Sequence, residues 1–262
     1  MKKHVLTYFG LTCLSCLIAL LVGCCIDIDN ALTAKYKKTE ILSLPIKGTN
    51  ALYIETDIGS ITITGADVTD CNIAAEITVR AGTKEKAREL AEHVKIELEP
   101  AGDKLTIKAG RPDGLKKRSV TVDFKITAPR QLNLNCETDV GSINVSDMQG
   151  PIEASTDVGS ITCRRVAADL DLKVNVGSIE VKYSDAAPAA CNVKIATNVG
   201  SIDFAGPPQI SAQLDASTNV GSIKTGQPVT VVGKLGKSIK GTIGSGEGKL
   251  HLRTNVGSIE IK

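Results

Sequence analysis

"STNVGSIKT" at residues 217–225 is one of seven closely similar stretches that recur along this 262-residue chain. From Gly141 onward, successive repeat glycines are 18, 18, 23, 21 and 36 residues apart. Strand-like sequence that repeats about every 20 residues is typical of a solenoid, in which each repeat forms one coil. The other six copies are "ETDIGSITI" (55–63), "ETDVGSINV" (137–145), "STDVGSITC" (155–163), "KVNVGSIEV" (173–181), "ATNVGSIDF" (196–204) and "RTNVGSIEI" (253–261).

The alternation of side chains within one repeat explains why the motif is needed. Inward positions are even-numbered before the glycine, as at Ala154 and Thr156, and odd-numbered after it, as at Ile161 and Cys163. Because a shift of one residue moves every side chain of a strand to the other face, the chain must turn or bulge at Val-Gly-Ser. Glycine accepts the positive φ of such a turn, and Asp or Asn before it also favours a turn. We therefore predict structural turns at Gly59, Gly141, Gly159, Gly177, Gly200, Gly221 and Gly257.

The fold class follows from this pattern. We expect an all-β protein, a single-stranded parallel β-helix (β-solenoid) of right-handed twist, with a small α/β section near its N-terminal end. Residues 83–99 predict a helix with Thr83 as its N-cap, and the 36-residue interval leaves room for a degenerate repeat at 238–248. The predicted segments are a signal peptide (1–23), a lipidated cysteine and polar tether (24–45), a first β coil plus the α/β section (46–130), and the solenoid repeats (131–262).

The N-terminus has the features of a bacterial lipoprotein signal. Lys2 and Lys3 precede a long apolar run that ends in Leu-Val-Gly-Cys24. This ending resembles a lipobox, and the resemblance implies cleavage before Cys24 and acyl chains on its sulfur and new amino terminus. An uncleaved membrane anchor is the alternative, because the run is about long enough to span a bilayer. Since Cys25 rather than Asp follows Cys24, we expect the outer membrane or cell surface rather than the inner membrane.

Charge and cysteine usage exclude several functions. Loss of residues 1–23 removes two lysines from the 31 basic residues and leaves 29 to balance 29 acidic ones, so no attraction to nucleic acid is expected. Cys136 and Cys163 stand where other repeats have apolar residues, which predicts small buried hydrophobic side chains. The remaining cysteines lack CxxC spacing, so neither a disulfide framework nor a metal site is predicted.

Acidic side chains at one repeat position are the candidates for chemistry. Asp57, Asp139 and Asp157 share this position, and Asp139 and Asp157 should lie on adjacent coils. Such a pair could bind Ca²⁺ or cleave a glycosidic bond as an acid–base pair. Four other repeats have Asn there, which favours a turn-forming role. We predict no catalytic residue and no cofactor, and Asp139 and Asp157 are the two residues to test for calcium.

The chain resembles the bacterial "putative adhesin" β-strand repeat family over residues 45–262. The resemblance is carried by "ETDIGSITITG" (55–65), "KEKARELAEHVKIEL" (84–98), the block at 120–150 and the later T-[DN]-V-G-S-I units. It implies a β-helix with a small α/β section and no established reaction. One departure is that Ser follows every repeat glycine, where the family usually has an acid.

These observations lead to an expected function. We expect a non-enzymatic, lipid-anchored envelope protein that presents a repetitive surface to a protein or glycan partner for adhesion, scaffolding or self-association. The alternatives are a carbohydrate-active β-helix enzyme and an accessory or sensor subunit of an envelope complex. The last repeat ends one residue before the C-terminus, which predicts an open strand edge and self-association through the C-terminal coil.

Overall fold

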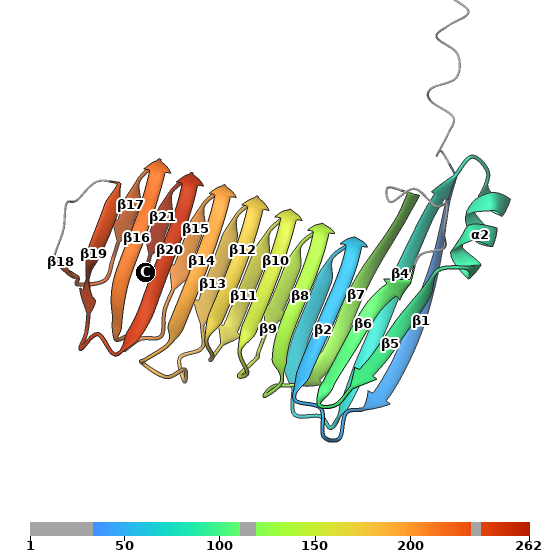
Figure 1. Cartoon of the computed structure of the whole chain (residues 1–262), viewed down its shortest axis with the longest axis horizontal. Helices are drawn as coiled ribbons and strands as arrows, with labels where there is room; N and C mark the ends of the chain where they lie inside the picture. Colours follow the sequence, from blue (N-terminus) through green and yellow to red (C-terminus); the bar gives the residue numbers. More distant parts are fainter. Residues whose placement is uncertain (1–33, 111–118, 232–236) are drawn as a thin grey trace, which may run out of the picture.

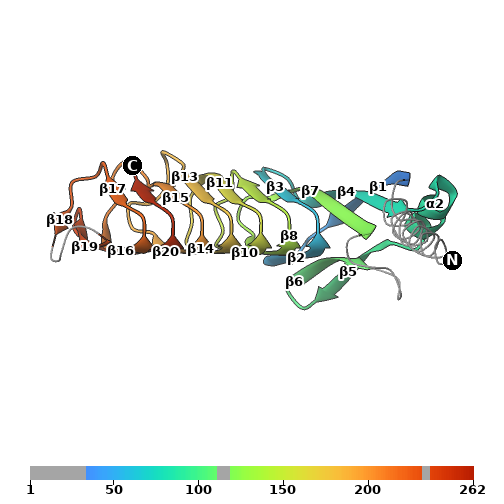
Figure 2. The same ribbon diagram turned by 90° about the horizontal axis from the view of Figure 1, so that it is seen from above.

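The computed structural model describes residues 34–110, 119–231 and 237–262. The predicted signal peptide and Cys24 lie outside these ranges. Within them the chain forms a long rod of two β-sheets packed face to face, with the helix at one end (Figures 1 and 2). The all-β, solenoid-like fold with parallel strands is therefore confirmed.

Sheet A and sheet B are the two layers of the rod, and most of their strands run parallel to their neighbours. Sheet A contains, in spatial order, β1 (Ala34–Pro45), β4 (Asp70–Ala81), β7 (Val120–Pro129), β3 (Ile61–Ala66), β9 (Ile143–Ser146), β11 (Ile161–Val166), β13 (Ile179–Tyr183), β15 (Ile202–Ala205), β21 (Ile259–Ile261) and β17 (Ile223–Thr225). Sheet B contains β18 (Thr230–Val231), β19 (Ser238–Ile243), β16 (Ala212–Val220), β20 (Gly248–Val256), β14 (Asn192–Val199), β12 (Leu170–Val176), β10 (Ile152–Val158), β8 (Asn133–Val140), β2 (Ala51–Ile58), β6 (Lys104–Gly110) and β5 (Lys95–Ala101).

Each repeat contributes one strand to sheet B, a corner at its glycine, and one strand to sheet A. In the coil formed by β10 and β11, Ala154, Thr156, Ile161 and Cys163 are all buried, so the inward positions change from even to odd across the corner as predicted. Gly159 in that corner has a φ of +156°. The core is the column of inward side chains between the sheets, where each fully buried Ile contributes about 1.5–3 kcal/mol.

Corner glycines stack directly on one another along the rod. A Cβ added to Gly177 would lie 1.6 Å from the carbonyl oxygen of Gly159, and one added to Gly159 would lie 1.8 Å from that of Gly141. The buried threonine of most repeats ties neighbouring corners together: Thr156 Oγ1 donates to the Gly141 carbonyl at 3.1 Å. Glycine is therefore required at these corners by the close approach of the next coil as well as by φ.

At the N-terminal end of the rod several strands pair antiparallel. β1 pairs with β4 over its full length, and β4 also pairs with β7. The tether predicted for residues 24–45 therefore does not extend to residue 45, since residues 34–45 form β1. Helix α2 (Lys84–Glu92) begins at Thr83, whose side chain accepts a hydrogen bond from Lys86 N, and it packs on β1 and β4 through Ala87 and Ala91. It is shorter than the predicted 83–99, because residues 95–101 pair with β6 as β5.

The C-terminal repeat is not at the end of the rod. β20 lies between β14 and β16, and β21 lies between β15 and β17, so both strands of the last repeat have neighbours on each side. Figure 1 shows the C-terminus among the strands rather than beyond β17. The predicted open edge at the C-terminal coil is therefore wrong. Residues 238–243 are also not a repeat copy, because they form β19, which pairs antiparallel with β16.

Candidate binding surface

The outer face of sheet B is a regular surface that extends along most of the rod. We define it as the outward side chains of seven neighbouring parallel strands, β2, β8, β10, β12, β14, β20 and β16, with four positions in each coil, of which Pro151 and Asp169 lie just before β10 and β12. Because side chains alternate along a strand, these positions form four straight rows across the sheet. The second row, for example, runs from Tyr53 on β2 through Glu153 on β10 to Lys194 on β14 and Asp215 on β16.

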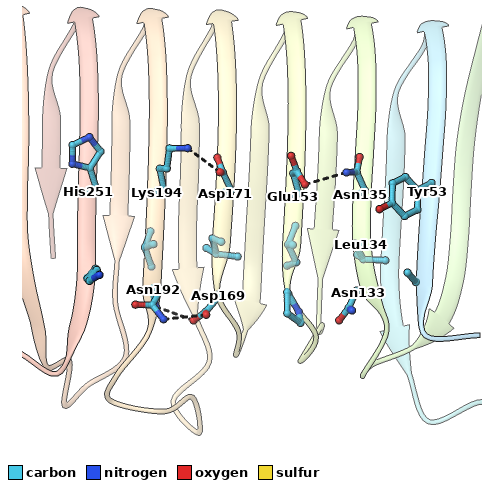
Figure 3. A pocket seen from close by; sticks show the side chains of 16 residues that line it. Tyr53, Asn133, Leu134, Asn135, Glu153, Asp169, Asp171, Asn192, Lys194 and His251 are labelled. Carbon is cyan, nitrogen blue, oxygen red and sulfur yellow. Dashed lines mark hydrogen bonds and ion pairs between the residues drawn. The ribbon is translucent and has the colours of Figure 1, made fainter. Parts of the chain in front are cut away.

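A shallow groove of about 550 Å³ runs across this face between its first two rows. Tyr53 lies at one end of the groove and His251 at the other, and Asn135, Glu153 and Lys194 lie between them (Figure 3). Six strands line it, so its length is about 25–30 Å at the usual strand spacing. An extended polymer or a second flat surface fits this shape better than a compact small molecule.

Short contacts between neighbouring strands hold the groove's side chains in place. Asp171 accepts from Lys194 Nζ at 3.0 Å and lies 3.5 Å from Lys173 Nζ. Nearer to Tyr53, Asn135 Nδ2 donates to Glu153 at 3.1 Å. Lys104 Nζ lies 3.3 Å from the centre of the Tyr53 ring, where a cation–π interaction stabilises both side chains. The surface is therefore arranged before any partner arrives, which lowers the entropic cost of binding.

The repeat position occupied by Asp or Asn forms the fourth row of the face. Asn198 donates to Asn175, Asn255 donates to Asn198 at 2.9 Å, and Asn219 donates to Asn255 at 3.1 Å. The acidic part of the row comprises Asp57, Asp139 and Asp157 on the adjacent strands β2, β8 and β10.

The acidic part of the row was the predicted candidate for calcium. Asp139 and Asp157 lie on neighbouring strands and line a second groove of about 380 Å³. Within the described ranges, no group of three or more His, Cys, Asp or Glu side chains is arranged to hold a metal ion. Calcium binding at this pair stays a prediction.

The other predicted residues lie at the corners and in the core. All seven repeat glycines have φ between +143° and +156°. Cys136 and Cys163 are fully buried free thiols, and burial raises the pKa of Cys163 to about 12. Burial likewise raises the pKa of Cys136. Because a thiolate is the reactive form, neither side chain is suited to nucleophilic chemistry.

The charged rows of the outer face were not predicted from the sequence. The alternation of apolar residues shows which positions of each repeat point outward. It does not show which strands lie side by side, because β20 inserts between β14 and β16. His251, for instance, lies 36 residues from Asp215 in the sequence, yet its Nδ1 is 3.9 Å from that carboxylate on β16. Writing the copies in register would have revealed the rows, but only the structure gives their order.

Comparison with known proteins assigns the fold to a family. The Toastrack DUF4097 family model matches residues 32–262. The chain belongs to this family. The Toastrack fold is also found in a solved structure described as a "putative cell adhesion protein" from Clostridium sporogenes, which is 11% identical with a TM-score of 0.51 over 87% of this chain and 99% of that one.

A second similar structure is a "putative adhesin" from Bacteroides fragilis, 14% identical with a TM-score of 0.43 over 86% of this chain and 97% of that one. A comparison with curated protein sequences gives no match. In the part of the Toastrack chain that the structure describes, no helix has the length and hydrophobicity needed to span a membrane.

Proposed function

We propose that this Toastrack protein is a non-enzymatic, lipid-anchored protein of the bacterial envelope that uses the outer face of sheet B to bind a partner. The observation that carries the proposal is the pre-arranged, charged and almost flat face with its long groove. Shape and regular charge on this scale suit adhesion or scaffolding, in which a large partner is held without chemical change. The names of the two similar structures point in the same direction.

The position of the rod relative to its anchor supports presentation at a surface. Nine residues, 25–33, separate Cys24 from the start of β1 at Ala34. A chain of nine residues reaches at most about 32 Å. Lipidation at Cys24 would therefore hold the end of the rod that carries α2 near the membrane, and the outer face of sheet B would remain accessible along the rod.

Two experiments test this proposal. Labelling of cells with an alkyne fatty acid should mark the wild-type protein, and the Cys24→Ala variant should be unlabelled and lost from the membrane fraction.

A photo-crosslinking residue placed at Asn135 or Lys194 on sheet B should capture a partner in native membranes. The same residue at Lys125 or Lys182, on the outer face of sheet A, is the matched control. Equal capture from both faces, or none from sheet B, would contradict the proposal.

A carbohydrate-active enzyme is the rival that one observation supports. Asp139 and Asp157 lie on adjacent strands and line a groove, as the two carboxylates of a retaining glycosidase do. Incubation of the purified protein with acidic and neutral polysaccharides should release no new reducing ends. Turnover that disappears in Asp139→Asn would establish the enzyme instead.

A further inference from the structure

The outer face of sheet B is acidic over one half of its length and basic over the other. Among the charged side chains, β2, β8, β10 and β12 present carboxylates with Lys173 as their one basic side chain, whereas β14, β20, β16 and the adjoining β19 present basic side chains with Asp215 as their one acid. Beyond β2, the adjoining β6 adds Lys104 and Lys108, and Lys108 Nζ lies 3.3 Å from Glu55. The outward acids of the first half are Glu55, Asp57, Glu137, Asp139, Glu153, Asp157, Asp169 and Asp171. The outward basic side chains of the second half are Lys194, Lys240, Lys249, His251 and Arg253.

We propose that this face binds a second copy of the same chain, with the two rods antiparallel. An antiparallel arrangement places the acidic half of each copy on the basic half of the other, so both ends of the interface are attractive. A parallel arrangement would place like charges opposite each other, which costs several kcal/mol in protein interfaces. The inference adds a partner to the proposed function and uses that proposal only for the position of the anchor.

A two-fold axis between β12 and β14, parallel to the strands, brings opposite charges face to face in the second row. In this arrangement Asp171 faces Lys194 of the second copy, and the Asp171–Lys194 pair that each chain already forms at 3.0 Å joins its counterpart in a cluster of four alternating charges. Strand β10 then lies opposite β20 of the second copy. Glu153 and Asp157 consequently meet the part of the face that carries His251 and Arg253.

The available area is sufficient for a specific interface. Seven strands spaced about 4.8 Å apart, each with four outward side chains, form a face of about 30 by 25 Å, or about 750 Å² per copy. Standard-size interfaces bury about 800 Å² per partner. Because the face is charged rather than apolar, we expect a dissociable dimer whose affinity depends strongly on salt.

The antiparallel arrangement has a consequence for adhesion. Helix α2 and β1 mark the end of the rod from which the chain leads back to Cys24 (Figure 1). In an antiparallel pair these ends point in opposite directions, so the two anchors lie at opposite ends of the dimer. Such a dimer suits two apposed membranes, each contributing one copy, and makes homophilic adhesion the form of binding that this geometry favours.

Sedimentation of the chain from residue 26 onward, which contains every described residue, tests the association directly. At about 0.01 M salt, where charges interact over about 30 Å, the wild-type protein should dimerise with increasing concentration. At about 1 M salt, where this distance falls to about 3 Å, the association should weaken by more than about tenfold. A wild-type protein that stays monomeric at low salt would overturn the proposal without affecting the lipid anchor or another envelope partner.

Charge reversal supplies a rescue experiment. One variant carries Glu137→Lys, Glu153→Lys and Asp157→Lys, and the other carries Lys194→Glu, Lys249→Glu and Arg253→Glu. Each variant alone should associate much more weakly than the wild type, because its reversed side chains meet like charges on the second copy, whereas the mixture of the two should form heterodimers. Heterodimer formation also shows that both variants are folded. The matched control, Lys125→Glu with Lys182→Glu and Lys224→Glu on sheet A, should dimerise like the wild type.

Orientation is tested at uncharged corner positions beside the face. Val158 ends β10 and Val256 ends β20, and both side chains are nearly half exposed. In the antiparallel dimer Val158 lies near Val256 of the second copy, so a mixture of Val158→Cys and Val256→Cys should be joined by a short bis-maleimide. Either variant alone should crosslink poorly. Stronger crosslinking of the single variants than of the mixture, or a charge-reversal mixture that remains monomeric, would overturn the antiparallel dimer.

Discussion

The repeat glycine forms the corner between the two strands of one coil and also contacts the corner of the next coil. Its positive φ forms the corner, and its carbonyl accepts the threonine hydroxyl of the neighbouring coil, as with Thr197 Oγ1 and Gly177 at 3.0 Å. In one coil Val174 stands in place of the threonine. The change from even to odd inward positions was enough to predict the corner from sequence. The hydroxyl contact was not predictable, because it depends on which coil is stacked next.

Substitution of Gly177 tests the requirement for close approach at a corner. Gly177→Ala should destabilise the protein by about 2–4 kcal/mol, because a Cβ would lie 1.6 Å from the Gly159 carbonyl oxygen on a backbone with φ of +143°. Gly102→Ala is the matched control, since Gly102 also has positive φ, at +65°, but has no atom within 4 Å of an added Cβ. The control should cost about 1 kcal/mol. Urea unfolding measures the free energy of unfolding of both variants. Equal losses would show that the positive φ, rather than the close approach of the next coil, sets the cost.

Strands and helices were predictable where the apolar alternation was uninterrupted. The inward side chains of the repeats follow it, and they are buried as expected. In β1 the alternation is masked because two inward residues are charged: Lys38 pairs with Glu40 at 2.8 Å and donates to the Ala91 carbonyl near the end of α2 at 3.3 Å. Residues 34–45 therefore resembled a polar tether. The charged rows of the outer face were visible as single residues but not as a surface, since their grouping depends on strand order.

The buried thiols of β4, β8 and β11 should make the free energy of unfolding decrease as the pH rises in the alkaline range. Burial raises the pKa of Cys71 to about 11 and of Cys163 to about 12, and it also raises the pKa of Cys136. An unfolded thiol has a pKa of about 8.5. The folded state thus keeps protons that the unfolded state releases, so this contribution is fully present below about pH 8.5 and is lost as pH rises toward the folded values.

Urea unfolding under reducing conditions measures the effect. Above about pH 9 each of these thiols should lower the free energy of unfolding by up to about 1.4 kcal/mol per pH unit. The triple variant Cys71→Ala, Cys136→Ala and Cys163→Val should lose this part of the slope, and valine already stands at the position of Cys163 in the neighbouring strands β9 and β13. Identical slopes for the variant and the wild type would contradict the assignment to thiols.

At the scale of the whole molecule, the order of coils along the rod differs from their order in the sequence. The chain completes the coil of β16 and β17, forms β18 and β19, and then returns to place β20 and β21 inside the stack. All repeats have similar edges, so β20 could pair with many strands as far as its own sequence is concerned. What selects its place is that β19 already covers the far edge of β16 with antiparallel pairing. Local sequence patterns therefore gave the coils but not their order.

Truncation distinguishes the inserted repeat from a terminal one. Removal of residues 248–262 deletes β20 and β21, the strands that link β14 to β16 and β15 to β17. In this variant the amide hydrogens of residues 212–225 should exchange as in an unfolded chain, because β16 to β19 no longer have a neighbouring coil against which to pair and bury their inward side chains. Amides of β2 through β12 should stay protected. Hydrogen exchange followed by mass spectrometry reads both regions in one sample. Protection of residues 212–225 in the truncated protein would mean that β16 can pair directly with β14, and that the last repeat is dispensable for the rest of the rod.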